Sequence, residues 1–316
     1  MRRNALFIAT LLTATFWISI TSPADRNDVP MAMSQQIALQ DATDTAQIAE
    51  AIKEFLSYEV GHIVSVGLLS TGVDGSRFGL KGRLLTGANF VENEPDILDR
   101  NGAGTYSAAL IARIASNARV LPIKVLNRLG QGSISRVVKG INFGIEEGTK
   151  ILLIPGETTT ESDHRLQEVI AQAREKGILL IAAAGSDRSS ERHYPAAFEG
   201  VLAVGATDIW DRKEAFSNFG DWVRLFAPWV DLKSVLSGSP GNISASNPEA
   251  AVVAGVAALV LGINPSLGAE GTKEILLGTA TDISTKNPGM GVGAWRVNAL
   301  AAVRAARIST WLKVKQ

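Results

Sequence analysis

The stretch that decides the fold is residues 63–74, IVSVGLLSTGVD, an apolar run that ends at Thr71 and Gly72. Short runs rich in Ile, Val and Leu are typical of strands buried on both faces of a parallel sheet. Further runs of this kind cover residues 119–125, 151–154, 178–184 and 201–206, and helical stretches at 133–147 and 163–176 follow two of them. This alternation predicts an α/β fold with a three-layer, doubly wound, mostly parallel sheet.

Other apolar segments predict helices around this sheet. Residues 250–263 are apolar all round, as in a central buried helix, and residues 271–278 and 298–308 are expected to close the domain. Residues 37–58 are predicted to form an amphipathic helix that packs on the main domain or, alternatively, binds a partner. We therefore expect a signal peptide at 1–24, a helical extension at 25–60, one domain at 61–310 and a C-terminal tail at 311–316.

The N-terminal residues indicate export. Arg2 and Arg3 precede an uncharged stretch over residues 5–20, and the small residues Ser22 and Ala24 follow it. This pattern is typical of a cleaved secretory signal peptide, and the stretch is shorter than the ~20 residues of a membrane-spanning helix. We expect a secreted or periplasmic protein. An uncleaved membrane anchor and a buried helix are the alternatives, so membrane association is expected only if residues 5–20 are retained.

Composition excludes several classes of function. The 316 residues hold 31 Lys and Arg against 31 Asp and Glu, so there is no basic field to attract nucleic acid and no nucleic-acid partner is expected. The absence of cysteine excludes disulfides, thiolate metal sites and a cysteine nucleophile. Only three histidines are present, His62, His164 and His193, which leaves little room for a histidine-rich metal site.

Seven segments in series resemble the subtilisin-like serine proteases, the peptidase S8 or subtilase family. Residues 63–74 resemble the family strand that ends in DTG, residues 99–109 (DRNGAGTYSAA) its NGHGTHVAG motif, and residues 194–208 its YPA and VIAVGATD motifs. The other similar segments are residues 120–135, 181–186, 216–230 and 245–259. The resemblance implies a subtilisin-like fold and a serine endopeptidase with an Asp–His–Ser triad.

The residues at the family's catalytic positions differ. Ser70 stands at the aspartate position, Ala103 at the histidine position, Asn247 at the serine position and Ser186 at the position of the oxyanion-hole asparagine. A serine without an adjacent base is a weak nucleophile, and loss of the serine or the histidine costs subtilisin ~10⁶-fold in kcat. The three histidines do not occur at the position that the resemblance requires. We therefore predict a degenerate member of the family with no catalytic residues.

The substrate cleft of the family is altered too. Ile154, Pro155 and Gly156 lie at the strand that pairs with an extended peptide, and Pro155 lacks an amide donor, which predicts weakened peptide binding. Asn247 is also interpreted as a helix cap, followed by a proline and by Glu249, whose charge suits the positive end of a helix.

Two acidic loops are candidate cation sites. One contains Glu92, Glu94, Asp96 and Asp99. Subtilases often hold calcium, which such oxygen-rich loops bind, but the spacing matches no defined calcium loop and we favour a solvated loop. Whether the protein binds a structural calcium ion stays open, and no other cofactor or metal is expected. The second loop contains Glu157, Glu161, Asp163 and His164, and we favour an ordinary polar loop over a hydrolytic or metal site.

These expectations lead to three hypotheses. The first is an exported, catalytically inactive pseudoprotease with a protein-binding, scaffold or regulatory role and a protein or peptide partner. The second is a residual serine endopeptidase or repurposed hydrolase that uses Ser186, Ser246 or residues 157–164. The third is an envelope component anchored by residues 5–20.

Overall fold

The computed structural model describes residues 48, 50–57, 61–154, 160–208, 210–229, 248–290 and 294–314, with side chains as far as residue 310. All of them belong to the compact unit that comprises residues 40–316. The predicted signal peptide, Pro155, Gly156, Glu157, Ser246 and Asn247 lie outside the described residues. The predicted domain boundaries stay a prediction.

The described residues form one sheet of nine strands in the order β2-β3-β1-β4-β5-β6-β7-β9-β8. All neighbours run parallel except β8 and β9, which are antiparallel. The strands are β1 (Val64–Ser70), β2 (Ala88–Asn89), β3 (Ala118–Lys124), β4 (Ile151–Ile154), β5 (Leu179–Ala183), β6 (Val201–Thr207), β7 (Leu225–Pro228), β8 (Thr281–Asp282) and β9 (Trp295–Arg296). The sheet confirms the predicted α/β fold and the five strands that the apolar runs indicate. β7 was not predicted, because Arg224 and Pro228 limit its apolar run to residues 225–227, and the two-residue strands β2, β8 and β9 are too short to carry a period.

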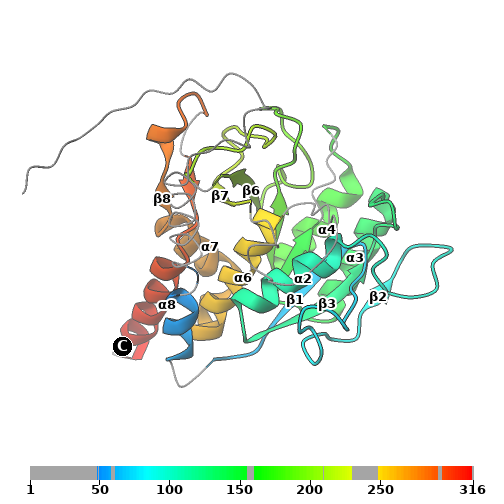
Figure 1. The fold of residues 1–316 in the computed structure, drawn as a ribbon, viewed down its shortest axis with the longest axis horizontal. Helices are drawn as coiled ribbons and strands as arrows, with labels where there is room; N and C mark the ends of the chain where they lie inside the picture. The colour runs from blue at the N-terminus through cyan, green and yellow to red at the C-terminus, as the bar shows by residue number, and fades with distance from the viewer. Residues whose placement is uncertain are drawn as a thin grey trace, which may run out of the picture. The chain divides into compact units, whose positions relative to one another are not determined.

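The helices flank the sheet as Figure 1 shows. They are α2 (Ala103–Ile114), α3 (Ile134–Glu146), α4 (His164–Glu175), α6 (Pro248–Ile263), α7 (Gly268–Gly278) and α8 (Ala299–Val314). Three begin at side-chain caps: Ser133 accepts a hydrogen bond from the amide of Arg136, Asp163 accepts from the amides of Arg165 and Leu166, and Asn298 accepts from the amide of Ala301. These caps satisfy amides that the first turn of a helix leaves free.

Two hydrophobic cores hold the layers together. One joins α2, α6, α7 and α8 to one face of the sheet, with strand residues such as Val66 and Leu68. The other joins α3 and α4 to the opposite face, with strand residues such as Leu121 and Ile123. Successive side chains of a strand point to opposite faces, so strands buried on both faces need apolar residues at nearly every position.

Helix α6 is the centre of the first core. All sixteen of its residues are buried, which confirms the predicted central helix. Gly255 lets α2 approach closely, because a Cβ at this position would lie 2.9 Å from the Cβ of Ile114. The amide of Asn117 donates to the carbonyl oxygens of Ala258 and His62, at 3.0 and 2.9 Å, and so ties α6 to the start of β1.

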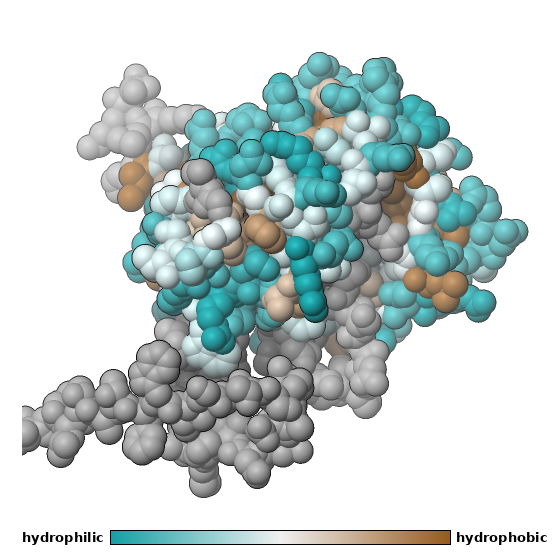
Figure 2. Space-filling model, turned by 90° about the horizontal axis from the view of Figure 1, so that it is seen from above, coloured by the Kyte–Doolittle hydropathy of each residue, from teal (hydrophilic) through white to brown (hydrophobic). Residues whose placement is uncertain are grey.

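Residues 50–56 form a helix beside α8, coloured blue and red in Figure 1. Ala51 and Phe55 are buried in the first core, and Glu54 pairs with Arg304 of α8 at 3.1 Å. On the face seen in Figure 2, hydrophilic residues predominate and hydrophobic ones form small separate areas. No single helix of the described residues is long and apolar enough to cross a membrane; α6 with α7 passes that test only as a pair bent by 105°.

Candidate functional site

From the chain topology we infer a crevice at the carboxyl edge of the sheet, between β1 and β4. After β1 the chain passes through α2 to β3 on one side, whereas after β4 it passes through α4 to β5 on the other. The two helices pack on opposite faces of the sheet, so the connecting loops diverge at this point. Ligands of doubly wound sheets bind at such a switch point.

Ser70 and Ala103 both lie at this edge. Ser70 is the last residue of β1 and is 7% exposed, and its carbonyl oxygen accepts hydrogen bonds from the amides of Val125 and Leu126 at 2.9 and 3.1 Å. Ala103 is the first residue of α2 and is buried. Gly104 allows the start of α2 to touch the chain after β1, because a Cβ at this position would lie within 2.0 Å of the carbonyl oxygen of Gly72.

Ser186 also borders the crevice, in an exposed loop that follows β5. Ile154 ends β4 and is buried. Of the predicted site residues that the structure describes, Ser70, Ala103, Ile154 and Ser186 thus come to the same edge of the sheet. Their correspondence with the catalytic and cleft positions of the family stays a prediction, as does that of Asn247, Pro155 and Gly156.

Asp99 fastens the two segments that border the crevice. One carboxylate oxygen accepts hydrogen bonds from the Thr71 hydroxyl and from the amides of Asn101 and Gly102, at 2.9, 2.9 and 2.8 Å. The other accepts from the amide and hydroxyl of Thr105, at 2.8 and 2.7 Å. Burial opposes ionisation of Asp99, but the bonds donated by Gly102 and Thr105 outweigh it and lower the pKa of this carboxyl group. Asp99 is therefore an ionised structural residue.

His193 is the one buried histidine of the described residues. It is 6% exposed, and its ring stacks on Trp222 with the centroids 6.4 Å apart. Its Nδ1 lies 3.5 Å from a carboxylate oxygen of Asp187, in the loop that contains Ser186. The sequence did not indicate this pair, because loop residues six positions apart carry no periodic signal. His164, by contrast, is 81% exposed and faces Glu168 at 3.3 Å.

Glu249 is a buried acid at the start of α6. It is 5% exposed, and burial raises its pKa to about 8. The sequence suggested that its negative charge suits the helix end. The structure places Glu249 in the first turn of α6, as expected, but the loss of hydration outweighs the attraction of the helix dipole and favours the neutral acid.

The acidic loop after β2 is neutralised by its neighbours. Glu92 pairs with Arg136, Glu94 with the buried Lys124 at 2.6 Å, and Asp96 with Arg100 at 2.7 Å. A backbone hydrogen bond and the bond from Arg136 lower the pKa of Glu92, and the bonds from Lys124 and Arg100 lower the pKa values of Glu94 and Asp96. The expectation of a solvated loop holds for the exposed Glu92 and Asp96 and is wrong for Glu94, whose side chain is 15% exposed.

Calcium does not fit this loop as the described residues form it. Both oxygens of Asp99 accept bonds from N–H and O–H donors, and the other carboxylates face Lys or Arg. Calcium takes six to eight oxygen ligands, among which carboxylates supply the negative charge, and the carboxylates of this loop are already engaged by cations and hydrogen-bond donors. Within the described ranges, no group of three or more His, Asp or Glu residues is placed to hold a metal ion, and Asp163 serves as the cap of α4.

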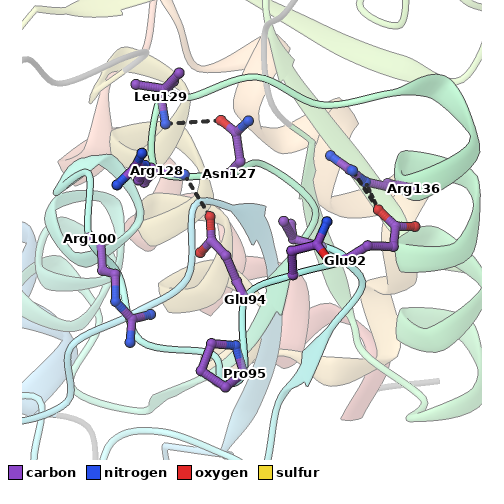
Figure 3. Close-up of a pocket in the computed structure, with 10 residues that line it drawn as sticks. Glu92, Glu94, Pro95, Arg100, Asn127, Arg128, Leu129 and Arg136 are labelled. Carbon is purple, nitrogen blue, oxygen red and sulfur yellow. Dashed lines mark hydrogen bonds and ion pairs between the residues drawn. The ribbon is translucent and has the colours of Figure 1, made fainter.

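A cavity of 570 Å³ opens between this loop and the turn that follows β3 (Figure 3). Its lining residues are Val91, Glu92, Asn93, Glu94, Pro95, Arg100, Asn127, Arg128, Leu129 and Arg136. Asn101, two residues before Ala103, donates a hydrogen bond to the carbonyl oxygen of Arg128 at 3.1 Å. The cavity is therefore joined to the crevice edge.

Comparison with known proteins identifies the family. The model of the subtilase family, peptidase S8, matches residues 61–294. The chain belongs to this family.

The relatives are named as proteases. Subtilisin BL of Lederbergia lenta is 32% identical over 255 residues, which cover 77% of this chain and 92% of the relative. The thermophilic serine proteinase of Bacillus sp. strain AK1 is 34% identical over 210 residues, and the alkaline protease of Alkalihalobacillus alcalophilus is 32% identical over 255 residues. These matches cover 62% and 77% of this chain, and the chain spans 51% and 65% of the two relatives.

Solved structures confirm the fold. A lanthipeptide protease superposes with a TM-score of 0.71 at 22% identity, over 84% of this chain and 94% of its own. A cold-adapted subtilisin-like serine proteinase superposes with a TM-score of 0.65 at 27% identity, over 76% of this chain and 90% of its own. The first match establishes the fold alone.

The prediction that this chain is not an enzyme is contradicted by these comparisons, because the relatives that it matches are named serine proteases. The prediction rested on the residues at the four catalytic positions of the family, and it gave them more weight than the similarity of the rest of the domain. The similarity to Subtilisin BL extends over 255 residues, which include the strands and loops that build the crevice.

Proposed function

We propose that this chain is an exported subtilase-family protein that binds an extended polypeptide in the crevice at the carboxyl edge of the sheet. The observation that carries the proposal is that hydrogen bonds tie together the segments that border the crevice. The Asp99 network fixes the chain after β1 to the start of α2, and Ser70 holds the chain after β3. Loops held this rigidly around a switch point suit ligand recognition.

The relatives support a polypeptide as the ligand. They are named as proteases, and an enzyme that cuts a polypeptide must first hold it in a defined geometry. Pro155 lacks an amide donor, and this absence predicts weaker peptide binding at one position. The other loops of the crevice stay available for binding.

Binding is tested with fluorescein-labelled β-casein by fluorescence anisotropy. Ser186→Trp places a bulky side chain at the crevice and should weaken binding at least about tenfold, the effect of roughly 1.4 kcal/mol. Ser57→Trp, at an exposed serine in the turn that follows the helix of residues 50–56, is the matched control and should bind as the unsubstituted protein does. Equal binding by both variants would contradict the proposal.

Cleavage of the bound chain is the second candidate function, and the names of the relatives favour it. The pair of His193 and Asp187 is the described histidine–carboxylate pair nearest in sequence to Ser186. Mass spectrometry of casein incubated with the protein tests this function. Fragments that disappear in His193→Ala while casein is still bound would assign the cleavage to this pair. Bound but intact casein would leave recognition as the function.

Export is proposed from the N-terminal pattern of Arg2, Arg3 and residues 5–20. N-terminal sequencing after cell fractionation tests it. A soluble chain outside the cytoplasm that begins near Asp25 is expected, whereas a membrane-bound chain that retains residues 5–20 would support the anchored envelope component.

A further inference from the structure

The cavity beside the crevice contains one cation, Arg128, that no carboxylate of the described residues neutralises. Arg136 is bound to Glu92, and Arg100 holds Asp96 through two bonds of 2.7 and 3.0 Å. Arg128 is exposed, and its guanidinium has no hydrogen bond or ion pair in the part of the chain that the structure describes. Figure 3 shows a dashed line from its backbone to Glu94, and none from its guanidinium.

The acids of the cavity are not available to repel an anion. Glu94 is held between the ammonium group of Lys124 at 2.6 Å and the backbone amide of Arg128 at 3.1 Å. Lys124 is fully buried and also donates to the carbonyl oxygen of Leu98 at 2.7 Å. With both glutamates paired, the three arginines of the lining leave one positive charge at Arg128.

Arg128 is presented by a turn that holds its own shape. The side-chain oxygen of Asn127 accepts hydrogen bonds from the amides of Leu129 and Gln131, at 2.9 and 3.0 Å. The backbone closes the turn through a bond of 2.9 Å from the amide of Asn127 to the carbonyl oxygen of Gln131. Leu129, next to Arg128, is 68% exposed. Arginine is enriched among the residues that contribute most to binding at protein interfaces, and a turn that is already ordered lowers the entropic cost of binding.

We propose that this cavity binds an acidic side chain of a polypeptide that lies in the crevice, and that Arg128 pairs with its carboxylate. The inference rests on the proposed polypeptide-binding function and adds to it a preference for aspartate or glutamate. The hydrogen bond from Asn101 to Arg128 places the turn next to the start of α2, so one extended chain reaches both. Guanidinium groups bind carboxylates through two parallel hydrogen bonds, which gives both attraction and direction.

The test uses a set of fluorescein-labelled peptides that carry one glutamate at successive positions, each matched by a peptide with glutamine at that position. At one position the glutamate peptide should bind about five- to tenfold more tightly, the effect of a charge-assisted bond at an open site. Arg128→Gln should abolish this preference, Arg128→Lys should keep part of it, and Arg128→Glu should reverse it in favour of the glutamine peptide. Arg113→Gln, an exposed arginine in the last turn of α2, should leave it unchanged.

The outcomes separate this inference from the proposed function. Tight binding of all peptides with no preference for glutamate would overturn the inference and leave polypeptide binding intact. Binding of none would overturn both. If glutarate displaces a glutamine peptide and the peptides show no preference for glutamate, the ligand of the cavity is a small free carboxylate. This result would overturn the proposal that the cavity binds an acidic side chain of a polypeptide.

Discussion

At the scale of single residues, the carboxylate of Asp99 joins the two segments that border the crevice. It accepts bonds from the hydroxyl groups of Thr71 and Thr105 and from three backbone amides. The Thr71 hydroxyl in turn accepts from the amide of Gly104 at 3.1 Å. A neutral side chain cannot satisfy so many donors, since an amide offers one acceptor oxygen and adds N–H groups of its own.

Replacement of Asp99 by Asn should therefore lower the free energy of unfolding by about 3 kcal/mol, because buried donors lose their acceptor. Urea denaturation at neutral pH measures this change. The lowered pKa of Asp99 means that its contribution is present above the unfolded value of 3.8 and is lost as pH falls through the folded value. The difference between the two proteins should therefore shrink in acid.

The control for this prediction is Asp96→Asn, which removes an acid with a side chain that is 45% exposed and pairs with Arg100. Exposed ion pairs contribute little, so this variant should unfold almost as the unsubstituted protein does. Equal losses in Asp96→Asn and Asp99→Asn would contradict the role of the network.

For Glu249 we expect the opposite dependence of stability on pH, because its pKa is raised. Below the usual value of 4.5 the acid is protonated in both the folded and the unfolded state. Between 4.5 and about 8 the unfolded state releases the proton first, so stability falls as pH rises. Glu249→Gln should unfold like the unsubstituted protein at pH 4 and be more stable at pH 9 by a few kcal/mol, on the order of 1.4 for each pKa unit.

Thermal unfolding at several pH values measures this effect. Glu270→Gln, in the first turn of α7 with a side chain that is 66% exposed, is the matched control and should show no such divergence. If the Glu249→Gln curve runs parallel to that of the unsubstituted protein from pH 4 to pH 9, the buried acid is not protonated in the folded state.

At the scale of elements, the contact between α2 and α6 decides how closely the helices cover the sheet. Gly255 faces Ile114, and the nearest three atoms of that side chain lie 2.9 to 3.2 Å from the position of an added Cβ. Both helices are almost fully buried, so neither can shift without disturbing the packing around it.

Gly255→Ala should therefore destabilise the protein by about 1–3 kcal/mol through overpacking, although alanine is the better helix former. Gly278→Ala, in α7, is the control, because an added Cβ there meets no atom within 4 Å. It should leave stability unchanged or raise it by up to about 1 kcal/mol. Calorimetric melting temperatures of the two variants test this prediction. If both variants melt at a higher temperature than the unsubstituted protein, α2 and α6 can move apart without loss of stability.

At the scale of the whole molecule, the crevice is assembled from segments far apart in the sequence. Residues 70–72, 99–105, 125–131 and 185–193 reach the same edge because the strands before them run parallel. Parallel strands deliver all their carboxyl ends to one side, which gives the loops there a common surface. The cavity at Arg128 and the His193–Asp187 pair both belong to this edge.

The amino-acid sequence by itself determined the architecture of this protein. Five apolar runs predicted β1, β3, β4, β5 and β6, and the unbroken apolar stretch at 250–263 predicted the buried helix α6. These signals are local, because the pattern of apolar residues within a segment indicates whether that segment is buried. The resemblance carried by these segments led to the subtilase family, which the comparison confirmed.

Only the tertiary structure decided which charges are neutralised and which stay free. It buried Lys124 against Glu94 and Glu249 at the start of α6, and it placed His193 beside Asp187. Among the described residues it also left Arg128 without an ion-pair partner at the cavity, although Arg100 and Arg136 in the same lining have partners. The reason is that an ion pair and a desolvated acid depend on how distant loops meet in space, and no periodicity in the sequence encodes that distance.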